Sequence, residues 1–316
     1  MLADAYLTGG AFDFPPDGLP HLRARGGPCN AAQFPANLLT VTIEIPGALR
    51  RITEEEIATF ALEGVVFLPA IISPEFVETM AAPVERALIS PETADVGAFA
   101  GGGPAPVFRA GSNHWRVDPD FERFACSGPI PGVAAALLES KEIWLYEDSV
   151  LVKEPGTPFK TEFHTDSAYF HVAGSQAATF WIPLDKADAS TGAVQYVRRS
   201  HLWDRDFRPN LFTIPDPIPG TEGEIVPEIL GDPELREQLV GFELVPGDVV
   251  VHHYRTLHGS PMNSSVTRRR RAISLRYCGD DIRYRFRPGL PKRSTQIGIE
   301  DGDSLGAPDT PQVWPV

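Results

Sequence analysis

From about residue 140 onward, short β-branched or aromatic runs alternate with turn residues, and no helix-length period separates them. A parallel βαβ unit needs a helix between its strands, so the pattern predicts an antiparallel sandwich or barrel. The 31 prolines and 28 glycines agree, because such frequent loop residues suit short strands better than long helices. The runs are EIWLYEDSVLVKEPG (142–156), ATFWIPLD (178–185), GAVQYVRRS (192–200), GFELVPGDVVVHHYRTLH (241–258) and RRAISLRYCGDD (270–281).

Two helices are expected before the strand-rich part. Thr53 followed three residues later by Glu56 predicts a capping box, and Gly64 is a suitable end for that helix before the strand VVFL. Ser73 followed by Pro74 predicts the start of a second helix, because proline is tolerated at the first helical position.

The predicted organisation is one domain with irregular ends. Residues 1–48 are rich in Gly, Pro and Asn and are expected to form an irregular arm. Residues 49–288 would form a single domain, and residues 289–316 an irregular tail. The Pro-rich stretch 204–240 is an insertion between strands, and loops of that length often serve as lids.

Charge and cysteine content exclude several protein classes. A net charge of −14 argues against general nucleic-acid or anionic-membrane binding, which needs a positive surface. Cys29, Cys126 and Cys278 lie far apart, with no CxxC spacing, so neither a disulfide framework nor a structural zinc site is predicted. No signal peptide or bilayer-length apolar run is visible, and a cytoplasmic location is expected.

The segment FHTDSAYFH (163–171) is a candidate metal site. In a strand, residues i and i+2 point to the same face, so His164 and Asp166 would direct an imidazole and a carboxylate to one point. One further imidazole would complete a two-histidine, one-carboxylate set, which leaves positions on Fe(II) open. HxD alone recurs by chance in many proteins, so other elements must support it.

A third ligand is expected from GDVVVHHYRTLHGS (247–260). Alternation places His252 and His258 on one face and His253 on the other. His258 is favoured because Gly259 follows it and allows ligands to come close. His252 and His253 follow the apolar run VVV, and the plainer interpretation makes them core or rim histidines.

Four consecutive arginines, 268–271, follow His258. A guanidinium binds a carboxylate through two parallel hydrogen bonds, which suits a barrel that holds a dicarboxylic co-substrate. Strand alternation puts Arg268 and Arg270 on one face and the other two on the opposite face. One pair is expected inside the barrel and the other in solvent.

Taken together, these segments resemble the phytanoyl-CoA dioxygenase family of Fe(II)- and 2-oxoglutarate-dependent oxygenases, over about residues 52 to 278. The matching segments are FHTDSAYF, ATFWIPLDKADASTGAVQYVRRSHL, VPGDVVVHHYRTLHGS and RRAISLRY. The resemblance implies a mainly β, double-stranded β-helix (jelly-roll, cupin-like) barrel with flanking helices.

The resemblance also implies roles for individual residues. His164, Asp166 and His258 fall on the iron ligands, and Arg270 falls on the arginine that binds the distal carboxylate of 2-oxoglutarate. Ser260 matches a hydroxyl that assists this arginine, and Trp181 matches a tryptophan of the co-substrate pocket. The spacing from His258 to the arginine is one residue longer than the family pattern, so Arg269 remains a competitor. Arg198 and Arg199 replace a Pro-Gly turn that is common in the family.

The implied function is a 2-oxoglutarate-dependent dioxygenase that uses O2 to hydroxylate, or otherwise oxidise, a small organic substrate and releases succinate and CO2. Asp166 argues against a halogenase, because those relatives lack this carboxylate. The alternative is a non-catalytic or differently catalytic metal-binding barrel of the cupin type. An acyl-CoA, an amino-acid-like molecule and a natural product all remain candidate substrates, and the oligomeric state is not predicted.

Overall fold

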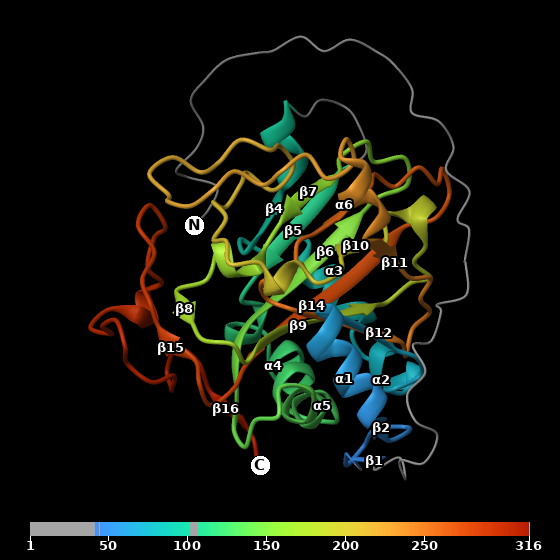
Figure 1. Ribbon diagram of the computed structural model, residues 1–316. Helices are drawn as coiled ribbons and strands as arrows, with labels where there is room; N and C mark the ends of the chain where they lie inside the picture. The colour runs from blue at the N-terminus through green and yellow to red at the C-terminus, as the bar shows by residue number, and fades with distance from the viewer. Residues whose placement is uncertain (1–41, 44, 102–106, 316) are drawn as a thin grey trace. The chain divides into compact units, whose positions relative to one another are not determined.

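The computed structural model describes residues 42–43, 45–101 and 107–315 (Figure 1). Most of the predicted arm at 1–48 therefore lies outside the described residues. The strands form two main sheets with antiparallel pairing throughout, as the alternating runs predict. The fold is the double-stranded β-helix expected from the sequence.

The larger sheet has the order β3-β12-β9-β14-β6-β5-β4, with β16 paired to β6. Its strands are β3 (Val65–Leu68), β4 (Thr93–Asp95), β5 (Phe108–Ser112), β6 (Ile143–Lys153), β9 (Ala177–Pro183), β12 (Val249–His253), β14 (Arg270–Cys278) and β16 (Gln312–Trp314). The smaller sheet, β11-β10-β13-β7, contains β7 (Thr161–His164), β10 (Gln195–Val197), β11 (Leu239–Gly241) and β13 (His258–Ser260). Two short ribbons pair β1 (Thr42–Ile43) with β2 (Ile52–Thr53), and β8 (Val172–Ala173) with β15 (Arg283–Tyr284).

The helices are short, and α1, α2, α4 and α5 gather on one side of the larger sheet (Figure 1). The α-helices are α1 (Glu54–Glu63), α2 (Pro74–Glu78), α3 (Ala81–Ala87), α4 (Pro119–Cys126), α5 (Ile130–Leu137) and α6 (Pro233–Glu237). Single 3-10 turns are η2 (Val96–Ala100), η3 (His114–Arg116), η4 (Asp166–Ala168), η5 (Ala189–Thr191), η6 (Ser200–Leu202) and η7 (Ser294–Gln296).

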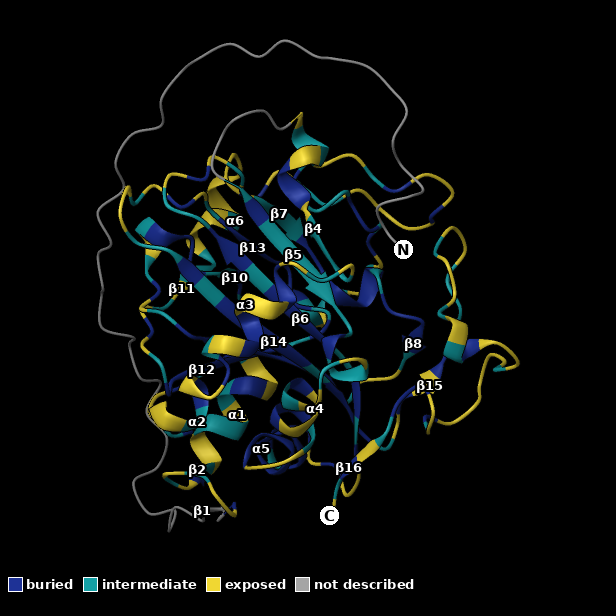
Figure 2. Ribbon diagram, turned by 180° about the vertical axis from the view of Figure 1, so that it is seen from behind, coloured by how far each residue is buried: buried dark blue, intermediate teal, exposed yellow. Residues whose placement is uncertain are grey.

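Side-chain alternation gives the larger sheet two different faces. Phe180, Ile182 and Leu275 point to the helices and join the largest hydrophobic cluster. Their strand neighbours Thr179 and Trp181 point the other way, into the barrel. In Figure 2, β6 and β14 are mainly buried, whereas β5 and β7 are mainly intermediate. One face therefore supplies the core, and the other is free to build a site.

The helix signals read from the sequence are confirmed where they are local. Thr53 and Glu56 form the capping box of α1, and Gly64 ends the helix with φ 73°. Ser73 caps α2, with Pro74 at its first position, but the expected second helix is divided into α2 and α3 near Thr79.

Helices α4 and α5 were not predicted. Seven of the eight residues of α5 are buried, so it carries no polar face and no amphipathic period in the sequence. Buried apolar runs of this length cannot be assigned to helix or strand from periodicity alone.

The predicted tail is mostly irregular over its described residues, 289–315, but it also contains η7 and the strand β16. Strand β16 pairs with the start of β6, so this part of the tail belongs to the larger sheet, which the sequence did not predict. The strand is only three residues long and a proline follows it, which hides it in the sequence.

The insertion 204–240 contains α6 and two isolated bridges, Phe207 with Glu224 and Asn210 with Pro217. It is thus held by local pairing, and its role as a lid stays a prediction.

The turn at Arg198 and Arg199, where the family commonly has Pro-Gly, is built differently, as expected. Arg199 takes the left-handed conformation, with φ 64°, and its guanidinium lies 2.8 Å from a carboxylate oxygen of Glu63.

Cys126 and Cys278 are free thiols, whereas Cys29 lies outside the described residues. Burial raises the pKa of Cys126 to about 11, which keeps this thiol protonated and unreactive at neutral pH. Within the described ranges, no helix is long and apolar enough to cross a bilayer.

Candidate active site

The two histidines of the predicted metal set lie opposite each other on paired strands of the smaller sheet. His164 ends β7, His258 begins β13, and the two residues are register partners with ring centroids 4.3 Å apart. The sequence suggested that Asp166 lies on the same strand as His164. In the structure, Asp166 instead begins η4, and Thr165 before it is still extended. The side chain of Asp166 therefore still turns to the histidines.

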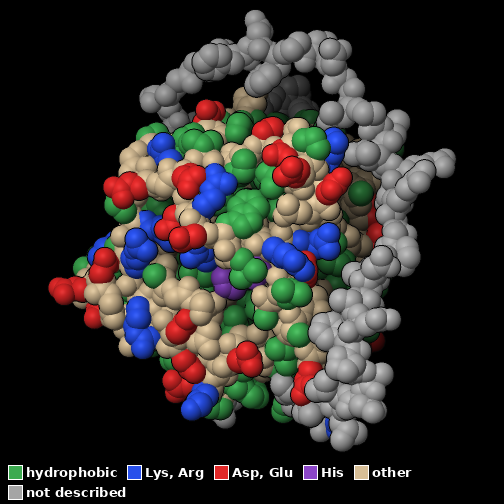
Figure 3. All heavy atoms as spheres, in the orientation of Figure 1, with side chains coloured by type: hydrophobic (Ala, Val, Ile, Leu, Met, Phe, Trp, Pro, Cys, Tyr) green, Lys and Arg blue, Asp and Glu red, His purple; other side chains and the backbone are tan. Residues whose placement is uncertain are grey.

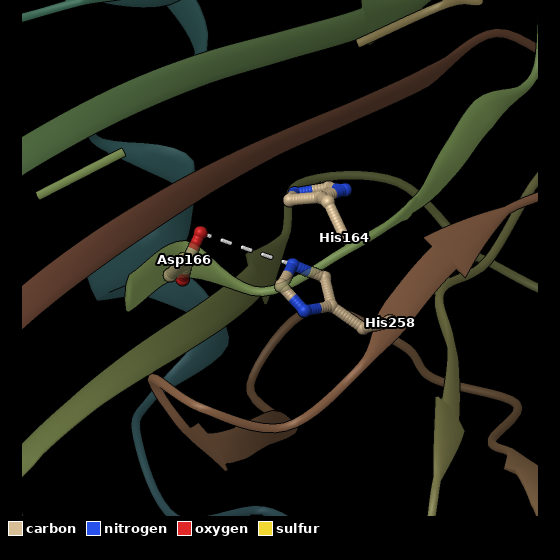
Figure 4. A group of neighbouring side chains, drawn as sticks. All are labelled: His164, Asp166 and His258. Atoms are coloured by element: carbon tan, nitrogen blue, oxygen red, sulfur yellow. Dashed lines mark ion pairs between the residues drawn. The ribbon is translucent and has the colours of Figure 1, made fainter. Parts of the chain in front are cut away.

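One ligand atom from each of His164, Asp166 and His258 lies within 4.8 Å of the other two, and all three residues are buried (Figure 4). Gly259 permits this approach, because a Cβ there would lie only 2.9 Å from the carbonyl oxygen of Thr161. The glycine is needed for close strand packing, since its φ is not in the left-handed region.

Backbone carbonyls orient both imidazoles. His164 Nδ1 lies 2.7 Å from the carbonyl oxygen of Glu162, and His258 Nδ1 lies 2.9 Å from that of Thr256. A carbonyl oxygen only accepts, so each Nδ1 carries the proton and each Nε2 keeps a free lone pair. Burial lowers the pKa of His164 to about 3 and that of His258 to about 4. Both rings are thus neutral, as metal ligands must be.

The carboxylate of Asp166 has one oxygen held and one free. Its Oδ2 accepts a hydrogen bond from Thr179 Oγ1 and another from His252 Nε2 at 3.3 Å. Its Oδ1 lies 3.9 Å from His258 Nε2. Burial alone would raise the pKa of Asp166, but the charge of Arg276 and the bond from His252 outweigh it and lower the pKa well below its usual range. The side chain is therefore an anion with one oxygen available to a cation.

His252 and His253 separate as strand alternation predicts. The ring centroid of His252 is 4.2 Å from that of His258, on the cavity side of β12. His253 faces away, and its Nε2 lies 2.8 Å from the carbonyl oxygen of Ser175. His252 is more than the core histidine of the plainer interpretation, because it bonds the carboxylate of the candidate metal set.

A second cluster, which we call the cationic end of the cavity, faces this set. Arg270 at the start of β14 is the register partner of Lys153 at the end of β6, and both are almost fully buried. Lys153 Nζ donates to Ser260 Oγ at 2.7 Å and to the carbonyl oxygen of Pro261 at 2.6 Å. Arg270 Nη1 donates to the carbonyl oxygen of Leu151 at 3.2 Å.

The cationic end has no ion-pair partner among the described residues, and only the more distant charge of Asp185 acts favourably on Arg270. Within the described ranges, neither Lys153 nor Arg270 forms an ion pair with a carboxylate, and Arg270 Nε has no hydrogen-bond partner. Burial lowers the pKa of Arg270 to about 10 and that of Lys153 well below its usual range. Buried charges without a counter-ion are costly, so this end of the cavity is suited to an anion. Trp181 Nε1, which also lacks a partner among the described residues, is a further donor at the cavity wall.

The neighbouring arginines lie elsewhere. Arg270 alone of residues 268–271 lines the cavity. Arg268 was expected on the same face as Arg270, but it lies elsewhere. It precedes β14, and its guanidinium pairs with Asp188 at 2.7 Å. The other two also form ion pairs, Arg269 with Glu85 and Glu154, and Arg271 with Asp185.

Arg276 is a further cavity cation that was not among the site residues predicted from the sequence. Unlike Arg270, it has carboxylates nearby: its Nε lies 3.8 Å from Asp166 Oδ2 and its Nη1 3.6 Å from Glu147 Oε1. It also donates to Ser149 Oγ at 2.6 Å. Arg276 lies on the same face of β14 as Arg270 and Ser274, because the three positions are separated by even numbers of residues. This spacing could have identified Arg276 as a cavity residue from the sequence.

The cavity between the ligand set and the cationic end has a volume of about 40 Å³. Phe212 of the insertion and Phe108 of β5 form what we call the aromatic end, beside His164. It adjoins the cationic end, because Phe108 is the register partner of Lys153, whose Nζ lies 4.7 Å from the centroid of the Phe108 ring. Phe212 was not predicted, because no local pattern shows that a loop returns to a distant strand.

Comparison with known proteins agrees with this geometry. The sequence model of the phytanoyl-CoA dioxygenase (PhyH) family matches residues 60–272. The chain belongs to this family. No curated protein matches the chain by sequence.

Three solved structures share the fold of this PhyH-family protein. The non-heme alpha ketoglutarate dependent carbocyclase SnoK from nogalamycin biosynthesis is 24% identical with a TM-score of 0.67, over 85% of this chain and 99% of SnoK. The epimerase SnoN, in complex with Fe3+, alpha ketoglutarate and nogalamycin RO, is 22% identical with a TM-score of 0.63, over 82% and 98%. EctD from S. alaskensis with bound Fe is 18% identical with a TM-score of 0.56, over 74% and 81%.

Proposed function

We propose that the protein is an Fe(II)- and 2-oxoglutarate-dependent dioxygenase that hydroxylates a small organic substrate. The observation that carries this proposal is the pairing of two incomplete charge sets in one cavity. An anionic, open-sided His-Asp-His set needs a cation, and the buried Arg270, which lines the same cavity, needs an anion. Lys153 lies behind the lining residue Ser260, to which it is hydrogen-bonded, and adds positive charge at this end. Iron(II) and a dicarboxylate meet both needs at once.

In this proposal, His164, Asp166 and His258 hold the iron. Their donor set, two neutral imidazoles and one carboxylate, is the facial set of non-haem iron oxygenases and leaves positions open. Thr179 and His252 hold the second carboxylate oxygen of Asp166, which orients the first oxygen to the metal.

The cationic end would hold 2-oxoglutarate. Arg270 offers its unpartnered Nε and its remaining guanidinium protons to the distal carboxylate, and Lys153 adds a second charge. Ser260 is fixed by Lys153 and contributes its hydroxyl, while the free Nε1 of Trp181 is a further donor. Arg269 is bound to two surface carboxylates, which favours Arg270 for this role.

Bound iron supplies, with 2-oxoglutarate and dioxygen, the oxidising power to convert a substrate C–H to C–OH, while succinate and CO2 are released. The residues of this chain bind, orient and exclude water. The aromatic end shields the open positions from solvent, and the fixed Nδ1 protons keep both imidazoles in one tautomer. SnoK and SnoN, a carbocyclase and an epimerase, have this fold, so cyclisation or epimerisation is the second candidate outcome.

A small apolar or ring-containing natural product fits the site better than an acyl-CoA. On the face seen in Figure 3, Lys and Arg side chains are interspersed with Asp and Glu. Several basic residues of the C-terminal region are engaged internally, which leaves them unsuited to a phosphate-binding rim. Arg293 pairs with Glu147 and Asp309, and Lys292 covers the ring of Phe286.

The test is a succinate-release screen with iron(II), 2-oxoglutarate and a panel of amino acids, acyl-CoAs, terpenoids, alkaloids and polyketides. We expect release with a member of the natural-product group and none without iron. Iron binding without 2-oxoglutarate consumption across the panel would favour the non-catalytic barrel. Turnover that needs the metal but not 2-oxoglutarate would favour a cupin-type isomerase or hydrolase.

A further inference from the structure

Phe212 is the one side chain of the insertion 204–240 that lines the cavity. Its ring centroid lies 5.5 Å from that of His164 and 5.8 Å from that of Phe108. The side chain is half-buried, with part of it exposed to solvent. The Phe212 ring therefore forms part of the cavity wall next to His164, at the boundary with solvent.

The backbone of Phe212 has φ 67°, in the left-handed region. A bulky residue there costs about 1–2 kcal/mol, whereas glycine or asparagine is tolerated well. A strained conformation of this kind persists only where the surrounding structure enforces it.

The enforcing structure is a clamp between the insertion and β7. The buried Asn210 accepts hydrogen bonds at its Oδ1 from Tyr169 Oη (2.8 Å) and from the backbone N–H of Phe212 (3.0 Å). The Nδ2 of Asn210 donates to the carbonyl oxygen of Phe163 at 3.0 Å. In addition, the backbone N–H of Glu162 donates to the carbonyl oxygen of Phe212 at 2.8 Å. The base of the insertion is thus bonded to the strand that carries His164.

This clamp fixes where a substrate meets the site. The cavity measures about 40 Å³, whereas small-molecule sites typically measure about 300 Å³ or more, so side chains of its wall must move to admit 2-oxoglutarate or a substrate. The cationic end is closed by buried strand residues, so a substrate must be accommodated at the aromatic end. Because the backbone at 210–212 is bonded to β7, the space available depends on the ring of Phe212 itself.

We infer that Phe212 is the specificity-determining residue of the site, because its ring limits the width of the ligand that reaches the open metal positions. The inference rests on the proposed function, which supplies the metal at the neighbouring His164. Slender or flat parts of a substrate pass the ring, and bulky branched parts are rejected. Asn210 and Tyr169 are positioning residues that hold the ring in place.

The test uses the full-length protein loaded with cobalt(II), which accepts the same nitrogen and oxygen ligands as iron(II) and absorbs visible light. Azide, imidazole and 4-phenylimidazole are titrated as probes of increasing width, and the cobalt absorption gives each affinity. In the wild type, we expect 4-phenylimidazole to bind at least about tenfold more weakly than imidazole.

Phe212→Ala should remove this difference while leaving azide affinity unchanged, and Phe212→Trp should enlarge it. Leu211→Ala, at the adjacent position outside the cavity wall, is the matched control and should resemble the wild type. If Phe212→Ala does not fold, Phe212→Leu provides the same comparison. An equal ratio in the wild type and the Phe212 variants overturns the inference alone. Failure of the wild type to bind cobalt(II) overturns the proposed function, and the inference with it.

Discussion

The cationic end of the cavity is built from adjacent strands, whereas the aromatic end is completed by a loop. Lys153 and Arg270 face each other because β6 and β14 are paired in register. Phe212 reaches the cavity through hydrogen bonds between an insertion and β7. The first end can change little without disturbing the sheet, while the second can change with one loop residue. We therefore expect the cationic end to set the co-substrate and the aromatic end to set the substrate.

The largest expected effect falls on the ligand set that both ends share. His164→Ala or Asp166→Ala should abolish metal binding and turnover, because either change removes one of three ligands. Metal binding is measured by calorimetry with cobalt(II), and circular dichroism checks the fold. His253→Ala, which lies on the opposite face of β12, is the control. Succinate release at the wild-type rate in both variants would make the assignment wrong.

The next effect isolates the cationic end. Arg270→Ala should weaken 2-oxoglutarate binding by about 3–5 kcal/mol, because a buried carboxylate loses its charged partner. The dependence of succinate release on 2-oxoglutarate concentration measures the change. Arg269→Ala removes only surface ion pairs and should alter this affinity by less than about 1 kcal/mol. The reverse ranking would move the role to Arg269.

Lys153→Met should have opposite effects on affinity and stability. We expect 2-oxoglutarate to bind about tenfold more weakly, because one of two charges is lost. Without 2-oxoglutarate, the variant should be at least as stable as the wild type, since methionine replaces a buried unpaired charge with an apolar side chain. Thermal unfolding with and without 2-oxoglutarate measures both. Loss of stability in the unliganded variant would show that Lys153 holds the fold rather than an anion.

The same lysine predicts a pH dependence. The pKa of Lys153 is lowered in the folded protein from 10.5, so between the lowered pKa and 10.5 the unfolded chain binds more protons. Stability of the unliganded protein should therefore gain a contribution as pH rises through this window. Urea unfolding across the alkaline range should show this gain in the wild type, and Lys153→Met should lack it.

The smallest effect is expected when the clamp of the aromatic end is loosened. Asn210→Ala leaves the Phe163 carbonyl and the Phe212 N–H without their side-chain partner and should lower the free energy of unfolding by about 1–3 kcal/mol. The affinity for 2-oxoglutarate should stay unchanged, because the clamp does not touch the cationic end. Urea unfolding and 2-oxoglutarate titration together measure this. A parallel loss of 2-oxoglutarate affinity would show that the two ends are not independent.

The strand-borne part of the site was predictable because strand periodicity is local. Alternation by two separates His252 from His253 on β12, and only Arg270 of residues 268–271 lines the cavity. His258 lies after a turn on another strand, β13, so its place near His252 and His164 comes from strand pairing and not from the alternation. Lys153 stood at the end of a predicted strand, but its partner Arg270 lies more than a hundred residues away. Only the register of β6 with β14 brings the two cations together.

The loop-borne part had no comparable signal. The left-handed backbone of Phe212 depends on Asn210, Tyr169 and Glu162, and turn propensities alone do not place a phenylalanine at positive φ. Helix α5 was missed because it is buried all round, and β16 because it is short. In each case, contacts distant in sequence outweighed local preference.

The pairing of His164 with His258 across β7 and β13 has a consequence for assembly of the barrel. A slip of one residue in either strand would turn one imidazole to the opposite face of the smaller sheet. Such a misaligned chain would offer a metal two ligands instead of three. Iron available during synthesis would then stabilise chains with the correct strand alignment more than misaligned ones, because only the correct alignment offers all three ligands. The metal would thus favour the correct pairing of β7 with β13 during folding, in addition to its role as a cofactor.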